Sequence, residues 1–155
     1  MSSSEPDYLQ VLNREQKQAV LHQGRSLLIL AGAGSGKTRV ITTKIAYLID
    51  QLGVDPHSIL AVTFTNKAAD EMHARVLTMA PEARGVMIRT FLSFGAWMLR
   101  RNAHLLGLNS NFSIYDDEDA LTLLHSLYNS YKRRELNTYN RMISRAKDYA
   151  LGPED

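Results

Sequence analysis

The chain has 155 residues, of which 45% are hydrophobic, so it is long and apolar enough for one domain with a real core and part of a second. It has no cysteine, which excludes disulfides and thiolate metal sites and fits a reducing compartment such as the cytoplasm. No apolar run approaches the length of a membrane span, and MSSSEPD lacks the basic and apolar regions of a secretion signal. The net charge of +2 is too near balance to indicate a nucleic-acid partner by itself.

The first predicted helix begins within the segment LNREQ, with Ala19 and Val20 on its inner face. Asn13 is a favourable N-cap, and Gln16 three positions later can complete a capping box. A second interpretation is that the Gln16 amide, which has donor and acceptor groups, binds the edge of an adenine base. The local sequence favours the cap and leaves both roles open.

A phosphate-binding loop follows the apolar run Leu27–Leu30, which we expect to be a buried strand, and precedes an amphipathic helix pattern. The loop reads AGAGSGKT over residues 31–38. Its glycines allow the backbone to approach an anion, so that N–H groups point at the phosphates. Lys37 is expected to reach the β/γ-phosphates and the Thr38 hydroxyl to hold Mg²⁺. Ala31 stands where the general pattern has glycine, which narrows the backbone angles but removes no donor.

Two more buried strands are predicted, Ile59–Val62 and Val86–Phe91, each followed by a helix pattern. Strand and helix thus alternate three times, which predicts a parallel α/β sheet with ligands at the carboxyl ends of its strands. Two of these ends carry Phe64 and Phe91 beside small polar residues, a combination suited to stacking on unpaired bases. The alternative, that both phenylalanines are core residues, is favoured by residue statistics alone.

The character of the chain changes from about Gly107, where two helices are predicted without a further strand. Asp116 or Asp117 is expected to cap the first, and a charged break at residues 132–135 to precede the second. The apolar positions of the first are Leu121, Leu124, Tyr128 and Tyr131, and those of the second are Leu136, Tyr139, Ile143, Ala146 and Ala150. We expect a helical subdomain whose apolar face needs more chain to bury it.

Together these motifs resemble those of the UvrD/Rep-type superfamily 1 DNA helicases over nearly the whole chain. LNREQKQAV resembles the Q motif, AGAGSGKTRV motif I, ILAVTFTNKAADEM motif Ia and IRTFLSFGAWMLRR motif Ib. The resemblance implies an α/β, RecA-like P-loop domain with a parallel sheet, residues 1–108 being the N-terminal part of domain 1A and residues 109–155 the start of the all-helical subdomain 1B. It also implies ATP and Mg²⁺ as cofactors, single-stranded and duplex DNA as partners, and 3′ to 5′ translocation in the bacterial cytoplasm during repair or replication.

The resemblance assigns residues to two sites. Nucleotide contacts are implied for Gln16, Ala31, Gly32, Ala33, Gly34, Ser35, Gly36, Lys37, Thr38 and Arg39, with Lys37 and Thr38 as the catalytic candidates. DNA contacts are implied for Thr63, Phe64, Thr65, Asn66, Thr90 and Phe91. Motif Ib departs from the family, because Leu92 stands where a histidine is usual, which puts a hydrogen bond to DNA at that position in doubt.

The family's motif II, an apolar strand that ends in Asp-Glu, has no match among the acidic pairs at 70–71, 116–117 and 154–155. We therefore expect an N-terminal fragment of a longer helicase that lacks ATPase activity alone, because it has no residue to activate water and no second RecA-like domain. The alternative class is a non-catalytic module that binds nucleotide or single-stranded DNA. A small-molecule kinase is disfavoured, since it leaves TFTNKAADEM unexplained and needs an acceptor-activating acid.

Overall fold

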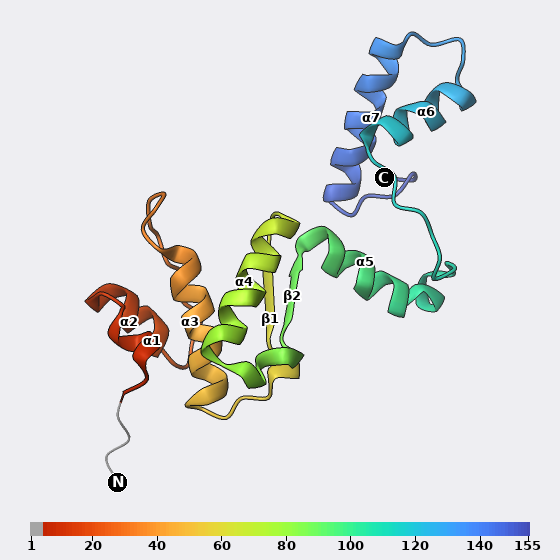
Figure 1. Cartoon of the computed structure of the whole chain (residues 1–155). Helices are drawn as coiled ribbons and strands as arrows, with labels where there is room; N and C mark the ends of the chain where they lie inside the picture. The colour runs from red at the N-terminus through yellow and green to blue at the C-terminus, as the bar shows by residue number, and fades with distance from the viewer. Residues whose placement is uncertain (1–4) are drawn as a thin grey trace. The chain divides into compact units, whose positions relative to one another are not determined.

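The computed structural model describes residues 5–155, which fall into two compact units that divide between Asn102 and Ala103 (Figure 1). The described part combines helices with one two-stranded parallel sheet, in agreement with the predicted α/β class. The first unit contains α1 (Asp7–Gln10), α2 (Arg14–Leu21), α3 (Lys37–Asp50), η1 (Pro56–Ser58), β1 (Leu60–Thr63), α4 (Asn66–Met79), η2 (Pro81–Gly85), β2 (Met87–Thr90) and α5 (Phe91–Arg101).

The sheet pairs β1 with β2, in parallel, from Leu60 opposite Met87 to Thr63 opposite Thr90. The second and third predicted strands are thus confirmed, with bounds shifted by a residue or more. Parallel neighbours need a crossover, and α4 supplies it while packing against both strands (Figure 1). Consequently the two strands end at the same edge of the sheet, as the sequence predicts.

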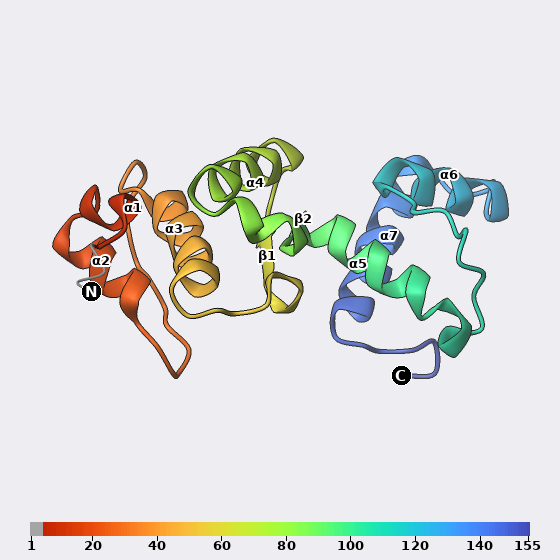
Figure 2. The ribbon, with the colours of Figure 1, turned by 60° about the horizontal axis from the view of Figure 1, so that its bottom comes forward.

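The main core lies where α3, α4 and the sheet meet. The two helices contact each other and run side by side in both views (Figures 1 and 2). Because apolar residues recur every three or four positions, each helix turns one stripe inward, and each large aliphatic side chain buried there contributes about 1.5–3 kcal/mol. The buried residues of this core are Ile45, Ala46, Ile49, Ala61, Met72, Val76, Ala80, Ala83 and Val86.

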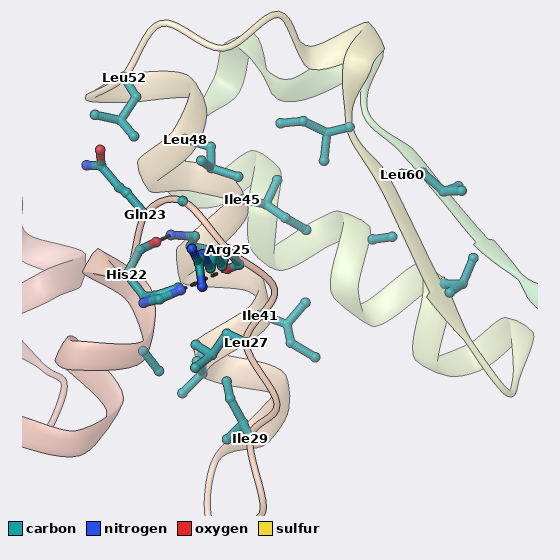
Figure 3. A pocket seen from close by; sticks show the side chains of 17 residues that line it. His22, Gln23, Arg25, Leu27, Ile29, Ile41, Ile45, Leu48, Leu52 and Leu60 are labelled. Carbon is teal, nitrogen blue, oxygen red and sulfur yellow. Dashed lines mark hydrogen bonds between the residues drawn. The ribbon is translucent and has the colours of Figure 1, made fainter.

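The predicted strand Leu27–Leu30 is wrong for this structure, in which the segment is neither strand nor helix. Leu28 and Leu30 are 80% and 86% exposed. A strand needs a neighbour for its backbone groups, and β1 lies across a hollow of about 690 Å³ from this segment. Figure 3 shows Leu27 and Ile29 on the α3 side of this hollow, near Ile41, with Leu60 opposite. An apolar run thus remains unpaired among the described residues.

The second unit contains η3 (Ala103–Leu106), α6 (Asp117–Leu127) and α7 (Arg133–Asp148). Both predicted helices are confirmed, although Ala150, which the sequence pattern assigns to the second, lies beyond the end of α7. Asp116 caps α6 by accepting the Asp119 N–H at 2.8 Å. Tyr131 lies beyond the end of α6, so its place in that helix is corrected; Tyr128 is already the C-cap, where the backbone leaves the helix. The charged run opens α7 rather than preceding it, because the Glu135 carboxylate accepts the Lys132 N–H at 2.8 Å.

The helices α6 and α7 pack through Leu121 and Leu136, while much of their remaining apolar surface is exposed. Met142 is 62% exposed, and Tyr128, Tyr131 and Tyr139 line an open hollow of about 600 Å³. Within residues 5–155, every helix is too short or too polar to cross a bilayer.

Candidate functional site

The phosphate loop turns sharply into the first turn of α3. Gly34 and Gly36 have φ angles of 75° and 86°, a left-handed conformation that glycine adopts without the clash of a side chain. Gly36 is the N-cap of α3, and its carbonyl accepts the Val40 N–H at 3.0 Å. The Ser35 hydroxyl donates to the Gly32 carbonyl at 2.7 Å. The loop therefore closes on itself just before the helix begins.

Lys37 lies across this loop. Its Nζ donates to the carbonyls of Ala31 and Gly32, both at 2.7 Å. These are charge-assisted hydrogen bonds, which place a full positive charge at the start of α3. The first turn of a helix also presents N–H groups without intrahelical acceptors and the positive end of the helix dipole. The geometry and charge of this corner suit an anion.

Gln16 makes hydrogen bonds both at the N-terminus of α2 and to the phosphate loop. It completes the predicted capping box of α2, because its N–H donates to Asn13 Oδ1 at 2.8 Å and its Oε1 accepts the Asn13 N–H at 3.1 Å. Its Nε2 donates to the Ser35 carbonyl at 3.0 Å, 19 residues further along the chain. A Cβ added to Gly36 would lie 2.7 Å from this Nε2. The cap is confirmed, and the structure adds a contact with the phosphate loop.

The donors of this corner fit a nucleoside triphosphate that arrives with its own Mg²⁺. Ala33, Thr38 and Arg39 are exposed on the loop and the first turn of α3. The Thr38 hydroxyl is a hard oxygen ligand of the kind Mg²⁺ takes, and this ion usually completes its shell with phosphates and water. In residues 5–155, three or more His, Cys, Asp or Glu side chains never converge as a metal site would require. The described residues would thus supply few of the ligands of the Mg²⁺ ion.

The carboxyl ends of β1 and β2 carry two exposed aromatic rings. Phe64 directly follows β1 and is 91% exposed, while Phe91 follows β2 and is 59% exposed. Their ring centroids are 6.1 Å apart with planes inclined at 49°. The alternative that both are core residues is therefore wrong. Adjacent exposed rings of this kind offer an apolar platform to a flat ligand.

The small polar residues beside these rings cap the helices that follow. Thr65 Oγ1 accepts the Ala68 N–H, and Thr90 Oγ1 accepts the Ser93 N–H, both at 3.1 Å. Thr90 is buried, whereas Asn66 is exposed on the first turn of α4. Leu92 is 69% exposed, so it extends the apolar surface at the position where the resemblance leads one to expect a polar group.

Sequence reasoning missed a polar hollow of about 510 Å³ behind the strand ends, between α4, β2 and α5. His73 and Arg89 line it together with Asn66, Asp70 and Ser93. The Arg89 guanidinium also lies 6.0 Å from the centroid of the Trp97 ring. The sequence did contain a signal for Arg89. It lies between Ile88 and Thr90 on a short predicted strand, and successive residues of a strand face opposite sides of the sheet.

The structure thus gathers the predicted residues into two groups. Gln16 joins the loop that ends in Lys37 through the hydrogen bond from its amide to Ser35, and Phe64 joins Phe91 through their rings. Thr63 and Thr90 are partners in the strand register, which aligns the two strand ends.

Comparison with known proteins identifies the family. The family model for the UvrD/REP helicase N-terminal domain matches residues 12–155. ATP-dependent DNA helicase UvrD1 of Mycobacterium tuberculosis is 56% identical over 115 residues, which cover 73% of this chain and 15% of that protein. ATP-dependent DNA helicase PcrA of Staphylococcus epidermidis is 44% identical over 149 residues, covering 93% of this chain and 20% of that protein. DNA helicase II of Rickettsia typhi is 45% identical over 154 residues, covering 95% of this chain and 23% of that protein.

The chain accordingly spans between 15% and 23% of the length of these curated relatives. The match to the family model extends from just before the capping box of α2 to the last residue, so it includes the phosphate loop and both strand ends. The chain belongs to the UvrD/REP helicase family and corresponds to its N-terminal domain.

Proposed function

We propose that the chain is the ATP-binding N-terminal part of an ATP-dependent DNA helicase that moves 3′ to 5′ along single-stranded DNA and unwinds duplex. The observation that carries the proposal is the loop at the start of α3, where Lys37 Nζ lies 2.7 Å from two loop carbonyls. The relatives named as ATP-dependent DNA helicases support the same activity for the parent protein.

In this proposal the loop residues Ala31–Thr38 hold the triphosphate. The backbone N–H groups and the Lys37 ammonium bind the β/γ-phosphates, and Lys37 exchanges its two carbonyl acceptors for phosphate oxygens. The Thr38 hydroxyl would supply one oxygen ligand to Mg²⁺, and the ion would supply charge that neutralises the phosphates. Gln16 contacts the adenine edge with the donor capacity that its cap and its bond to Ser35 leave, and Arg39 binds nucleotide from the first turn of α3.

The strand ends bind DNA in this proposal. Phe64 and Phe91 stack on unpaired bases, because both rings are exposed and their contact with each other leaves most of their surface free for a base. Thr63, Thr65 and Asn66 lie beside the rings, where small polar groups and N–H donors can hold the backbone phosphates. The predicted contact at Thr90 is less favoured by this structure, because its hydroxyl is buried and hydrogen-bonded to Ser93. Movement along DNA then requires a second RecA-like domain in the parent, so that nucleotide turnover alternates the grip on the strand.

We further propose that the parent has a RecA-like fold, that residues 1–108 belong to its domain 1A and that residues 109–155 begin its subdomain 1B. The exposed tyrosines and Met142 of α6 and α7 support an extension of the helical unit.

For the chain by itself, a non-catalytic role is the second candidate. In residues 5–155 the acidic pair at 70–71 lies inside α4, that at 116–117 opens α6, and that at 154–155 follows α7. None of them directly follows β1 or β2, where a water-activating carboxylate beside a phosphate would be expected. We therefore propose that the chain binds nucleotide and single-stranded DNA without hydrolysing ATP.

Two titrations of the chain test the proposal. In the first, the chain is titrated into a fluorescent ATP analogue in the presence of Mg²⁺. Inorganic triphosphate and unlabelled ATP are then added as competitors. We expect saturable binding that both competitors displace, because the loop recognises phosphates. In the second, anisotropy of a labelled oligothymidine should rise on addition of the chain. Phosphate release should stay at the level of the buffer. Failure to bind the analogue would contradict the nucleotide site, and steady turnover would contradict the non-catalytic role.

A further inference from the structure

The helix α2 is fixed to the rest of the first unit near both of its ends. Near its start, Gln16 Nε2 donates to the Ser35 carbonyl of the phosphate loop at 3.0 Å. At its end, Lys44 Nζ from α3 donates to the carbonyl of Val20 at 2.7 Å and to the carbonyl of His22. His22 is the C-cap of α2, and its ring is hydrogen-bonded to the Arg25 carbonyl at 2.9 Å (Figure 3).

Lys44 provides a strong clamp because of where its charge lies. The last carbonyls of a helix have no intrahelical donor and form the negative end of the helix dipole, so an ammonium is favourable there. The side chain is half-buried, and this burial lowers the pKa of Lys44. Its ammonium also lies 5.9 Å from the centroid of the Tyr47 ring.

The helix between the two attachments is short and rigid. Its eight residues span about 12 Å at 1.5 Å per residue. Val20 is 0% exposed and packs with Leu9 and Val40, so the helix cannot easily rotate. Lys44 also follows the loop lysine, Lys37, by seven residues, which places both near one face of α3 two turns apart. The contacts therefore form a closed ring. The phosphate loop leads into α3, Lys44 of α3 bonds the end of α2, and Gln16 of α2 bonds Ser35 of the loop.

We propose that Lys44 is a positioning residue for the nucleotide site, acting through α2 and Gln16 on the carbonyl of Ser35. The proposal rests on the nucleotide-binding function proposed above. In it, Lys44 touches no nucleotide atom. It sets the position of α2, so that Gln16 holds the loop residue just before Gly36 in the conformation that directs the loop N–H groups at phosphate.

The test compares Lys44→Met, which keeps most of the length and apolar packing of the side chain but removes the donor, with Lys44→Arg, which keeps a cationic donor. Lys17→Met is the matched control, because Lys17 lies on α2 but pairs with Glu5 rather than with α3. We expect Lys44→Met to weaken binding of the fluorescent ATP analogue about three- to tenfold, the size of a lost hydrogen bond. Lys44→Arg and Lys17→Met should stay within about twofold of the wild type.

A double-mutant cycle separates positioning from general destabilisation. If Lys44 acts through Gln16, adding Lys44→Met to Gln16→Ala should weaken the affinity by less than about twofold further, whereas independent effects would multiply. A multiplied loss of affinity would overturn the proposal. If Lys44→Met does not fold, as judged by circular dichroism, Lys44→Gln takes its place, since it retains part of the donor capacity.

A second readout needs no nucleotide. Solvent exchange of the Gln16 side-chain NH₂, followed by NMR in the free chain, reports the hydrogen bond to Ser35 directly. Lys44→Met should accelerate this exchange, and Lys17→Met should not. An unchanged Gln16 signal in Lys44→Met would overturn the inference even if nucleotide affinity fell. If the wild type binds no nucleotide, the proposed function fails, while this measurement still decides whether Lys44 positions Gln16.

Discussion

The phosphate loop and the strand ends differ in the contacts that their side chains make in the free protein. In the loop, polar atoms bind one another, as Lys37 does with two carbonyls, Ser35 with Gly32 and Gln16 with Ser35. At the strand ends, Phe64 and Phe91 contact each other but leave most of their surface in water. A ligand of the loop must therefore replace existing hydrogen bonds, whereas a ligand of the strand ends gains mainly by covering apolar surface. The two regions should respond separately to mutation.

The largest effect is expected for Lys37→Ala. Loss of a charged donor to phosphate should weaken binding of the ATP analogue to the chain by about 1.5–3 kcal/mol, roughly 10- to 100-fold, and abolish ATP hydrolysis in the parent. Lys67→Ala is the control, because Lys67 is an exposed lysine in the first turn of α4. Equal affinities in the two variants would contradict the role of Lys37. The oligothymidine titration should not change, which keeps the two regions distinct.

Phe64→Ala should produce the complementary result. Removing a stacking ring should weaken oligothymidine binding by about 1–3 kcal/mol, with nucleotide affinity unchanged. The chain should remain folded, because the side chain is 91% exposed. Leu92→Ala is the control, since it removes a comparably exposed apolar side chain without a π-face. Anisotropy measures both variants, and a Leu92→Ala effect as large as that of Phe64→Ala would indicate apolar contact rather than stacking.

Gly36→Ala sharpens the comparison within the loop itself. Alanine at a φ of 86° is strained by about 1–2 kcal/mol, and its Cβ would press on Gln16 Nε2. Gly32→Ala is the matched control, because a Cβ there meets nothing within 4 Å. Urea unfolding should show Gly36→Ala less stable by about that amount and Gly32→Ala nearly unchanged. Equal losses at the two positions would mean that the loop conformation is not fixed before ligand binds.

The smallest effect is expected outside both regions, at the hydrogen bond from Tyr8 Oη to Asp50 Oδ2, 2.5 Å long. Tyr8→Phe should lower stability by about 0.5–1 kcal/mol, because this bond is exposed to water, and should leave both titrations unchanged. A change in either titration would mean that α1 also shapes a binding region.

This effect should depend on pH. The Tyr8 hydroxyl holds the pKa of the Asp50 carboxyl below its ordinary value of 3.8, with Gln51 contributing a second hydrogen bond. A depressed folded pKa stabilises the native state above the ordinary value, and the gain is lost as pH falls through the folded pKa. The stability difference between wild type and Tyr8→Phe should therefore shrink below about pH 4. A difference that grows in acid would contradict the assignment.

The sequence predicted best what short stretches of chain determine. Asn13 and Gln16 form their capping box, and Asp116 caps α6, because partners three residues apart meet in any helix start. The strand at Leu27–Leu30 failed because a strand depends on a neighbour distant in the chain, and apolar composition cannot supply one.

The candidate site shows the same division. The resemblance selected Phe64 and Phe91 against residue statistics, and both are exposed. The bond from Gln16 to Ser35 and the clamp from Lys44 to the end of α2 were missed, since each joins residues 19 to 24 positions apart. No local pattern marks a lysine in an amphipathic helix as a donor to another helix.

The free edge of β1 has a consequence for handling the protein. Within the described residues β1 has one bonded side, and a strand of this kind is a template on which a second molecule can add a strand. Concentrated solutions of the chain should accordingly form β-rich oligomers over time, and dilute samples with a mild detergent should remain monodisperse longest.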